Sequence, residues 1–315
     1  MVLYKIQNGI IGHAIGDALG VPVEFKSRKS LNANPVTNMI GFGTYPVPAG
    51  TWSDDTSLEI ALMESICENK TIDYVDIMEK FSSWYYEDFY TATGKRFDVG
   101  GTCANAIGNF RIGTAPLACG LTNIRSNGNG SLMRILPIAY ICYEHRLSYT
   151  DTYRIVKDVS SLTHRHEISI LGCYIYVQFV KSLLMGMDSR KAYENIKTID
   201  YSMFSRDSLE EYSRILDDNI DLFNINQISS TSYVVSTLEA ALWCVLNNSN
   251  YRNTVLTAVN LGSDTDTIGA VAGSIAGIEY GISGIPKEWR DGLKAKQYLL
   301  RICGDFADAL PIIRL

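Results

Sequence analysis

Two short segments each combine two carboxylates with hydroxyl side chains just before an apolar stretch. The residues are Ser53, Asp54 and Asp55 in TWSDDT, and Asp264, Asp266 and Thr267 in GSDTDT. Such oxygen ligands, with no His or Cys beside them, suit Mg²⁺ or Mn²⁺ better than zinc. Because residues two apart point about 200° from one another inside a helix, Asp264 and Asp266 can face one point only at an irregular loop-to-helix junction. Each segment alone is more often a helix N-cap, but the pair favours a divalent metal site.

Two further acidic residues are candidates for the same chemistry. Glu24 follows a small-residue stretch and a turn, where a solvent-exposed loop glutamate is the ordinary alternative. Asp98 stands between Phe97 and Val99, just before a glycine pair. A carboxylate held among apolar neighbours can act as a general base, because burial raises its pKa. The spacing equally allows Asp98 to cap a helix that begins near Gly101.

Two segments are candidates for contacts with an anionic ligand. The glycine-rich SNGNGSLMR, residues 126–134, is predicted to open a helix and to carry Arg134 on its first turn, and backbone N–H groups at such a junction bind phosphate. It is neither a Walker A loop nor a dinucleotide fingerprint. The segment THRH holds His164 and His166. Beside oxygen-rich sites, we favour a hydrogen-bonding or stacking role for this pair over metal binding, with an exposed helix end as the alternative.

These segments need a scaffold, and the hydrophobic spacing predicts a helical one. Apolar residues recur at helical intervals, whereas the alternation typical of strands is rare. Two stretches rich in glycine and alanine, 12–20 and 269–281, are expected to be core helices in backbone contact, because Gly otherwise weakens a helix by about 1 kcal/mol. We therefore predict one all-α domain over residues 1–315, a compact orthogonal helical bundle. Helices are expected near residues 55–67, 73–87, 101–110, 131–145, 151–163, 167–185, 189–197, 208–218, 231–246, 251–260 and 267–280.

Composition argues against several classes of protein. The 315 residues include 28 Lys and Arg against 34 Asp and Glu, so nucleic-acid binding through a basic surface is not expected. Seven Cys form no CxxC pair, which indicates reduced core thiols rather than disulfides or a zinc site. The N-terminus lacks the pattern of a secretory leader, and no apolar run approaches the roughly 18 residues of a membrane span. We expect a cytoplasmic protein without membrane association.

In their order and spacing, these segments resemble the ADP-ribosylglycohydrolase family. The likeness runs from about residue 8 to about residue 290, and residues 186–230 resemble the family least. It rests on GDALGVPVEF, GTWSDDT, FDVGGTCANAI, GNGSLMRILP, LTHRHEIS and NLGSDTDTIGAVAGSIAGIEYGISGIPKEW. The combination of SDDT, DTDT and GNGSLMR is highly specific. The sequence is most similar to the dinitrogenase-reductase-activating branch, which acts on ADP-ribosyl-arginine.

The resemblance implies an all-α enzyme with two Mg²⁺ or Mn²⁺ ions at the centre of the bundle. The implied metal ligands are Ser53, Asp54, Asp55, Asp264, Asp266 and Thr267. Asp98 matches the catalytic carboxylate of the arginine-specific branch, and Glu24 matches a catalytic-site ligand or gate. The implied substrate-binding residues are Asn127, Gly128, Asn129, Gly130, Ser131, Met133, His164 and Tyr233. The family usually has Thr where this chain has Ser53, and both residues offer a hydroxyl.

The implied activity is hydrolysis of the N-glycosidic bond between ADP-ribose and a modified arginine, by a monomer acting on an ADP-ribosylated protein or small molecule. An alternative keeps the fold but changes the acceptor to ADP-ribosyl-serine, an O-acyl-ADP-ribose or another ADP-ribosylated group. Asp98 favours the arginine type over branches whose catalytic acid is at the position of Glu24. The hypothesis of a non-catalytic ADP-ribose-binding relative is disfavoured, because a site that has lost its activity has no physical reason to keep mutually repelling carboxylates.

Overall fold

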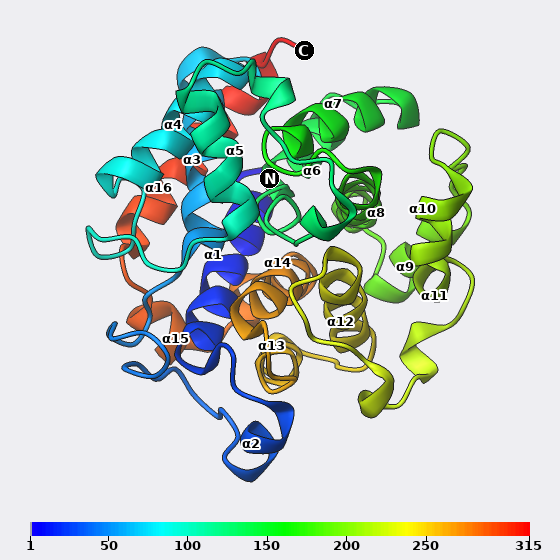
Figure 1. Ribbon diagram of the computed structural model, residues 1–315. Helices are drawn as coiled ribbons and strands as arrows, with labels where there is room; N and C mark the ends of the chain where they lie inside the picture. The colour runs from blue at the N-terminus through cyan, green and yellow to red at the C-terminus, as the bar shows by residue number, and fades with distance from the viewer. Residues whose placement is uncertain (1) are drawn as a thin grey trace.

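Helices make up the regular structure of the computed structural model, which describes residues 2–315 (Figure 1). Within these residues, β pairing is limited to isolated bridges, so the all-α prediction is confirmed. The α-helices are α1 (Val2–Gly20), α2 (Arg28–Ala33), α3 (Asp54–Asn69), α4 (Tyr74–Glu87), α5 (Gly101–Arg111), α6 (Leu136–Glu144), α7 (Tyr149–Ser161), α8 (Glu167–Leu184), α9 (Ser189–Lys197), α10 (Arg206–Glu211), α11 (Ser213–Leu216), α12 (Val234–Leu246), α13 (Tyr251–Val259), α14 (Thr265–Gly284), α15 (Lys287–Gly292) and α16 (Lys296–Ala309). Short 3-10 helices are η1 (Val21–Val23), η2 (Pro116–Ala118), η3 (Ile124–Ser126), η4 (Ile220–Leu222), η5 (Ile225–Gln227) and η6 (Leu310–Ile312).

Most predicted helices agree with the structure to within a few residues, but two of them differ and three observed helices were not predicted. The helix expected at 131–145 begins only at Leu136, because residues 131–134 form turns. The helix expected at 208–218 is two short ones, α10 and α11. The prediction missed α2, α15 and α16. In α16 the buried residues follow helical spacing, so the sequence carried that signal: Leu299, Ile302, Cys303 and Phe306.

Helices α1 and α14 run side by side at the centre of the bundle with their backbones in contact (Figure 1). A Cβ atom on Gly16 would overlap the carbonyl oxygen of Gly269, and one on Gly20 would overlap the backbone of Asp266. The predicted core position of both small-residue stretches is therefore confirmed. Because the helices are antiparallel, the end of α1 lies against the start of α14.

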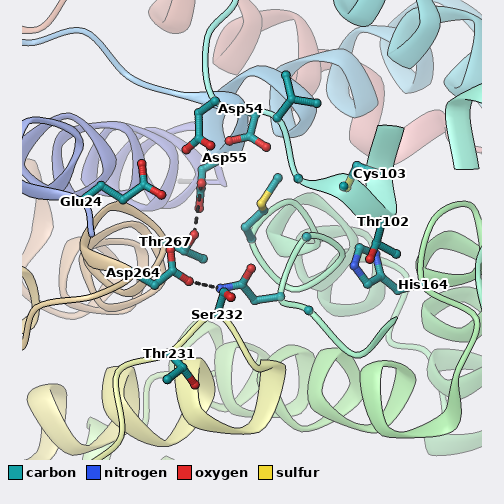
Figure 2. A pocket seen from close by; sticks show the side chains of 18 of the residues that line it. Glu24, Asp54, Asp55, Thr102, Cys103, His164, Thr231, Ser232, Asp264 and Thr267 are labelled. Atoms are coloured by element: carbon teal, nitrogen blue, oxygen red, sulfur yellow. Dashed lines mark hydrogen bonds between the residues drawn. The ribbon is translucent and has the colours of Figure 1, made fainter. Parts of the chain in front are cut away.

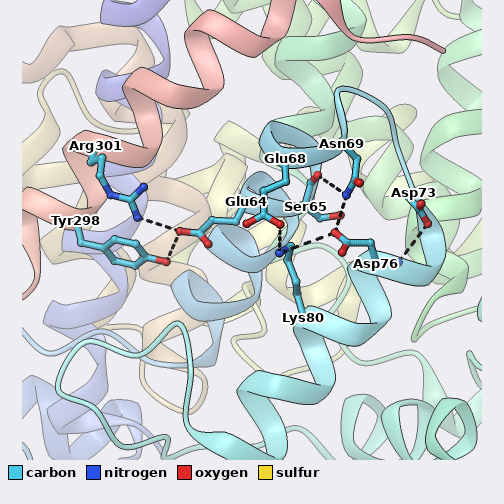
Figure 3. Close-up of polar contacts among 9 residues, drawn as sticks. All are labelled: Glu64, Ser65, Glu68, Asn69, Asp73, Asp76, Lys80, Tyr298 and Arg301. Atoms are coloured by element: carbon cyan, nitrogen blue, oxygen red, sulfur yellow. Dashed lines mark hydrogen bonds and ion pairs between the residues drawn. The ribbon is translucent and has the colours of Figure 1, made fainter.

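Helix α3 is held in place by polar contacts to its neighbours on both sides (Figure 3). Glu64 accepts hydrogen bonds from the Tyr298 hydroxyl at 2.8 Å and from Arg301 Nη2 at 3.1 Å, both on α16. On the other side, Lys80 Nζ of α4 donates to Glu68 Oε2 at 2.6 Å. These contacts fix the rotation of α3 about its axis, and with it the direction in which the first turn points.

Helix α8 is an exception to the prediction that no apolar run approaches the length of a membrane span. Its 18 residues have a mean hydropathy of 1.3, so the helix is long and apolar enough to cross a membrane. Of that window, 94% is buried inside the bundle, and its composition is that of a core helix. The seven Cys are all buried free thiols, as predicted.

Candidate active site

The first acidic segment lies at the N-terminus of α3. Ser53 is the N-cap residue, and its Oγ lies 3.3 Å from the Asp55 backbone nitrogen and 3.2 Å from Asp55 Oδ2. The fully buried Asp17 of α1 organises this turn, since its carboxylate accepts from Ser53 N at 2.9 Å and from Thr56 Oγ1 at 2.6 Å. Our sequence analysis did not select Asp17. The sequence signal that could have identified Asp17 is a charged residue inside a stretch of Gly, Ala and Ile.

The second acidic segment lies at the irregular junction that the sequence predicts. Ser263 has a left-handed backbone, with φ of 65°, and α14 begins two residues later. Asp264 occupies the N-cap position but makes no capping bond, because its Oδ2 accepts a 2.5 Å hydrogen bond from Asn129 Nδ2 instead. Thr267 Oγ1 donates to Asp55 Oδ2 at 3.3 Å. This bond joins the two acidic segments.

Glu24 clusters with the second acidic segment, and Asp54 and Asp55 of the first segment line the same cavity (Figure 2). One oxygen each from Glu24, Asp264 and Asp266 lie within 4.8 Å of one another. Glu24 is only 4% exposed, so the alternative of a solvated loop residue is wrong. Among the described residues of the two segments and Glu24, three buried carboxylate oxygens have no hydrogen-bond partner: Glu24 Oε2, Asp55 Oδ1 and Asp266 Oδ2. Unpartnered carboxylate oxygens around a common point are the donor set that a hard divalent cation requires.

Burial and mutual repulsion raise the pKa values of these carboxyl groups. Desolvation first, and the charge of Asp98 second, raise the pKa of Glu24 to about 9. Desolvation raises the pKa of Asp264 to about 6, against the opposing effect of the hydrogen bond from Asn129. Desolvation followed by neighbouring carboxylates also raises the pKa values of Asp54, Asp55 and Asp266. A bound cation would remove this repulsion, so the electrostatics also fit a metal site.

Asp98 lines the same cavity from the segment before α5. Its backbone is left-handed, with φ of 51°, a strained conformation that is common at functional sites. Gly100 is the N-cap of α5, so the alternative interpretation of Asp98 as a helix cap is wrong. In the turn-rich loop, Thr44 Oγ1 donates to the Glu24 carbonyl oxygen at 2.7 Å, and the ring of Tyr45 packs against Phe97 with centroids 4.9 Å apart. The turn-rich loop that carries Tyr45 therefore connects the segments of Glu24 and Asp98.

The glycine-rich segment reaches the cavity in part. Among the predicted substrate residues, four from this segment line the cavity: Gly128, Asn129, Gly130 and Met133. The N–H groups of Gly128 and Gly130 donate to no acceptor within residues 2–315, which leaves them available to a phosphate. Three other predicted residues do not line the cavity in this part of the chain, and their side chains bond within the protein: Asn127 to Ser169, Ser131 to Ser160, and Tyr233 to Glu211.

Arg134 does not point at the cavity, contrary to prediction. It is fully buried, and its Nη1 donates to the Gly130 carbonyl at 2.6 Å while Nη2 donates to Val159 O at 3.1 Å. The turns over residues 131–134 precede α6, so Arg134 is not on a first helical turn. The guanidinium instead holds the glycine-rich loop in shape. The exposed cation at the cavity is Arg125, just before this loop, which our sequence analysis did not select.

His164 lies on the cavity wall as a neutral hydrogen-bonding group. It is 2% exposed, and its Nδ1 lies 2.8 Å from Thr163 Oγ1. Desolvation first, and the charge of Arg134 second, lower its pKa to about 3. His166 is the N-cap of α8, and its Nδ1 accepts from a backbone N–H of that helix. The two histidines are thus not an exposed pair.

The cavity has a volume of about 580 Å³, within the range of sites for small molecules and cofactors. The acidic cluster forms one part of its wall, and His164 and the glycine-rich loop form another (Figure 2). Phe25 and Ser263 lie on its lining, together with Thr231 and Ser232 from the segment before α12. Predicted residues from distant parts of the sequence, among them Glu24, Asp98 and His164, therefore surround one space.

The chain is similar to proteins of described activity over nearly its whole length. The family model described as ADP-ribosylglycohydrolase matches residues 2–312. The chain is 31% identical to the ADP-ribosylarginine hydrolase Tri1 of Pseudomonas putida, with 98% of this chain and 79% of that protein aligned. It is 29% identical to the ADP-ribosyl-dinitrogen reductase glycohydrolase of Rhodospirillum rubrum, over 93% of this chain and 91% of that one. A solved ADP-ribosylglycohydrolase-related protein complex matches with a TM-score of 0.76 and 25% identity, over 98% of this chain and 99% of the other.

Proposed function

The chain belongs to the ADP-ribosylglycohydrolase family, and we propose that it releases ADP-ribose from a modified arginine side chain by hydrolysing the N-glycosidic bond. The observation that carries the proposal is the cluster of carboxylate oxygens from Glu24, Asp264 and Asp266, beside a cavity that Asp54, Asp55 and Asp98 also line. Two relatives named for ADP-ribosylarginine and for ADP-ribosylated dinitrogen reductase support the choice of acceptor. The enzyme class follows from the family, and the acceptor follows from these relatives.

Two divalent ions, Mg²⁺ or Mn²⁺, are part of the proposal. Their ligands would come from the first turn of α3 and the first turn of α14, with Glu24 beside them. The proposed set is Ser53, Asp54, Asp55, Asp264, Asp266 and Thr267. When bound, such ions act as Lewis acids that hold ribose hydroxyls and lower the pKa of water. The unpartnered oxygens of Glu24, Asp55 and Asp266 support this assignment.

The protein's own groups would then bind the substrate and move a proton. The free N–H groups of Gly128 and Gly130 would hold the diphosphate, since backbone donors in a glycine-rich loop suit phosphate oxygens. Positive charge that develops at the anomeric carbon would be stabilised by the carboxylates around it. Asp98 would take a proton from the ribose hydroxyl or the attacking water, and would return one to the departing guanidine. Both direct displacement and sugar-ring opening use Asp98 in this way.

The test is release of free ADP-ribose from an ADP-ribosyl-arginine protein in the presence of Mg²⁺, Mn²⁺ or EDTA. We expect release with either metal and none with EDTA. Asp54→Ala is expected to abolish release by weakening metal binding. A matched ADP-ribosyl-serine peptide serves as the control substrate. Release from the ADP-ribosyl-serine peptide alone would show that the acceptor is serine and not arginine. Binding of ADP-ribose by calorimetry without release from either substrate would make the protein a non-catalytic relative.

A further inference from the structure

A second groove adjoins the catalytic cavity and shares part of its wall. Phe25 and Ser263 line both spaces, so the groove continues the cavity outwards. Its volume is about 520 Å³. The other residues that line the groove are Lys26, Ser27, Arg28, Ile228, Ser229, Ser230 and Leu261. A molecule that extends out of the cavity past Phe25 would enter this groove.

Phe25 forms the ridge between the cavity and the groove. Its side chain is 69% exposed, and its backbone is left-handed with φ of 64°, an unfavourable conformation for an aromatic residue. A reciprocal pair of backbone bonds holds it there: Phe25 N donates to Ser263 O at 2.7 Å, and Ser263 N donates to Lys26 O at 2.8 Å. The ridge therefore has a fixed place between the segments that carry Glu24 and Asp264.

The groove carries positive charge, whereas the cavity beside it is acidic. Lys26, Arg28 and Lys29 lie within four residues of one another in a chain whose net charge is −6. Arg28 is fixed by carbonyl oxygens, with Nε 2.8 Å from Leu261 O and Nη2 2.7 Å from Ile228 O. Within residues 2–315, none of the three cations forms an ion pair with a carboxylate. The exposed Lys26 is thus open to a partner, whereas Arg28 adds an unneutralised positive charge with its donors held by the protein.

We propose that this groove binds an acidic stretch of the polypeptide that carries the ADP-ribosylated arginine. The inference rests on the proposed function and adds the character of the substrate protein to it. A cavity of about 580 Å³ admits a modified side chain but no folded protein, so the chain flanking the arginine must cross the rim. Across such a rim, opposite charges favour correct partners and raise the rate of association. Carboxylates beside the modified arginine would meet Lys26 and Arg28 here.

The test compares three substrates that share one glycosidic bond. They are ADP-ribosyl-agmatine, which has no polypeptide, and two peptides with a central ADP-ribosylarginine flanked either by Asp and Glu or by Asn and Gln. The variant Lys26→Glu reverses charge in the groove. The matched control Lys157→Glu makes the same change in net charge at an exposed position on α7, away from the groove. Arg28 is left unchanged, because its bonds to backbone carbonyls make it part of the fold.

We expect the wild type to have a lower KM for the acidic peptide than for the neutral one, with the same kcat. Lys26→Glu should raise KM for the acidic peptide about fivefold, leave kcat unchanged, and leave both constants for ADP-ribosyl-agmatine unchanged. Lys157→Glu should change none of these constants. High salt should remove the advantage of the acidic peptide.

Two results would overturn the inference. Equal KM values for the two peptides in wild type and variant would show that the groove does not contact the polypeptide. An equal rise in KM for ADP-ribosyl-agmatine would show that Lys26 acts on the ADP-ribose instead. Failure of the proposed function is seen separately, because wild-type protein would then release nothing from ADP-ribosyl-agmatine.

Discussion

Asp264→Asn should stabilise the metal-free protein at neutral and alkaline pH, although it removes a proposed metal ligand. In the metal-free protein Asp264 is buried beside other carboxylates, and its ionised form is disfavoured there. An asparagine of the same size keeps an oxygen to accept the hydrogen bond that Asn129 now donates to Asp264 Oδ2. The substitution therefore removes the buried charge and keeps the contact.

The pKa of Asp264 gives the size and sign of the effect. Burial raises it from 3.8 to about 6, a difference of about 2 units, which corresponds to a free energy on the order of 3 kcal/mol. Because the pKa of Asp264 is higher in the folded state, the stability that this group contributes to the wild type is fully present below pH 4. It is lost as the pH rises through 6. Asp264→Asn should thus match the wild type at pH 4 and exceed it by about 3 kcal/mol at pH 8.

Urea denaturation at pH 4, 6 and 8 in EDTA would measure this difference, and repetition with Mn²⁺ would measure the metal's contribution. We expect Mn²⁺ to stabilise the wild type at pH 8 and to leave the variant nearly unchanged, because a ligand that binds only the native state raises its stability. A variant that is less stable than the wild type at pH 8 in EDTA would refute the reasoning. Equal stabilisation of both proteins by Mn²⁺ would remove Asp264 from the proposed ligand set.

Three further perturbations probe other parts of the site. Asp98→Asn should lower turnover on ADP-ribosyl-agmatine by about 10²- to 10⁴-fold and keep the stabilisation by Mn²⁺, measured by thermal unfolding; full turnover would exclude Asp98 from catalysis. Asp17→Ala should reduce the free energy of unfolding by about 1–3 kcal/mol, because it leaves the buried N–H of Ser53 without its acceptor; an unchanged urea midpoint would contradict this role. Gly16→Ala should cost about 1–3 kcal/mol through overlap with Gly269, and a more stable variant would show that the two helices separate easily.

The all-α class and the two acidic segments were predictable because their signals are local. Helical spacing and capping preferences act within a few residues, so the sequence correctly placed the irregular junction before Asp264. The same local signals cannot say where a side chain goes once a helix is packed. Arg134 was predicted to lie on the first turn of a helix beside the glycine-rich loop, yet it lies in turns before α6 and its guanidinium donates to the carbonyl oxygens of Gly130 and Val159. Only tertiary packing determines that choice.

The parts of the site that escaped prediction depend on contacts between distant segments. Asp17 matters because α3 docks on α1, 36 residues later in the chain at Ser53. Tyr45 matters because its loop bridges the segments of Glu24 and Asp98, through Thr44 on one side and the ring of Phe97 on the other. Asn127 and Tyr233 were expected to face the substrate, but each has a nearer partner inside the protein. Pairings over such separations are not visible in one sequence.

The glycine contact between α1 and α14 fixes the position of the acidic cluster, whereas the residues at the rim of the cavity can vary. The spacing between Glu24, just beyond α1, and the start of α14 is set by backbone pressed on backbone, with no side-chain rotamer between them. The close packing of these helices thus fixes the distance between the segments that hold the acidic cluster. The rim residues Phe25, Lys26 and Arg125 are exposed and lie outside this contact between helices. Under the proposed function, we expect substitutions there to change which modified protein is accepted while the acidic cluster stays the same.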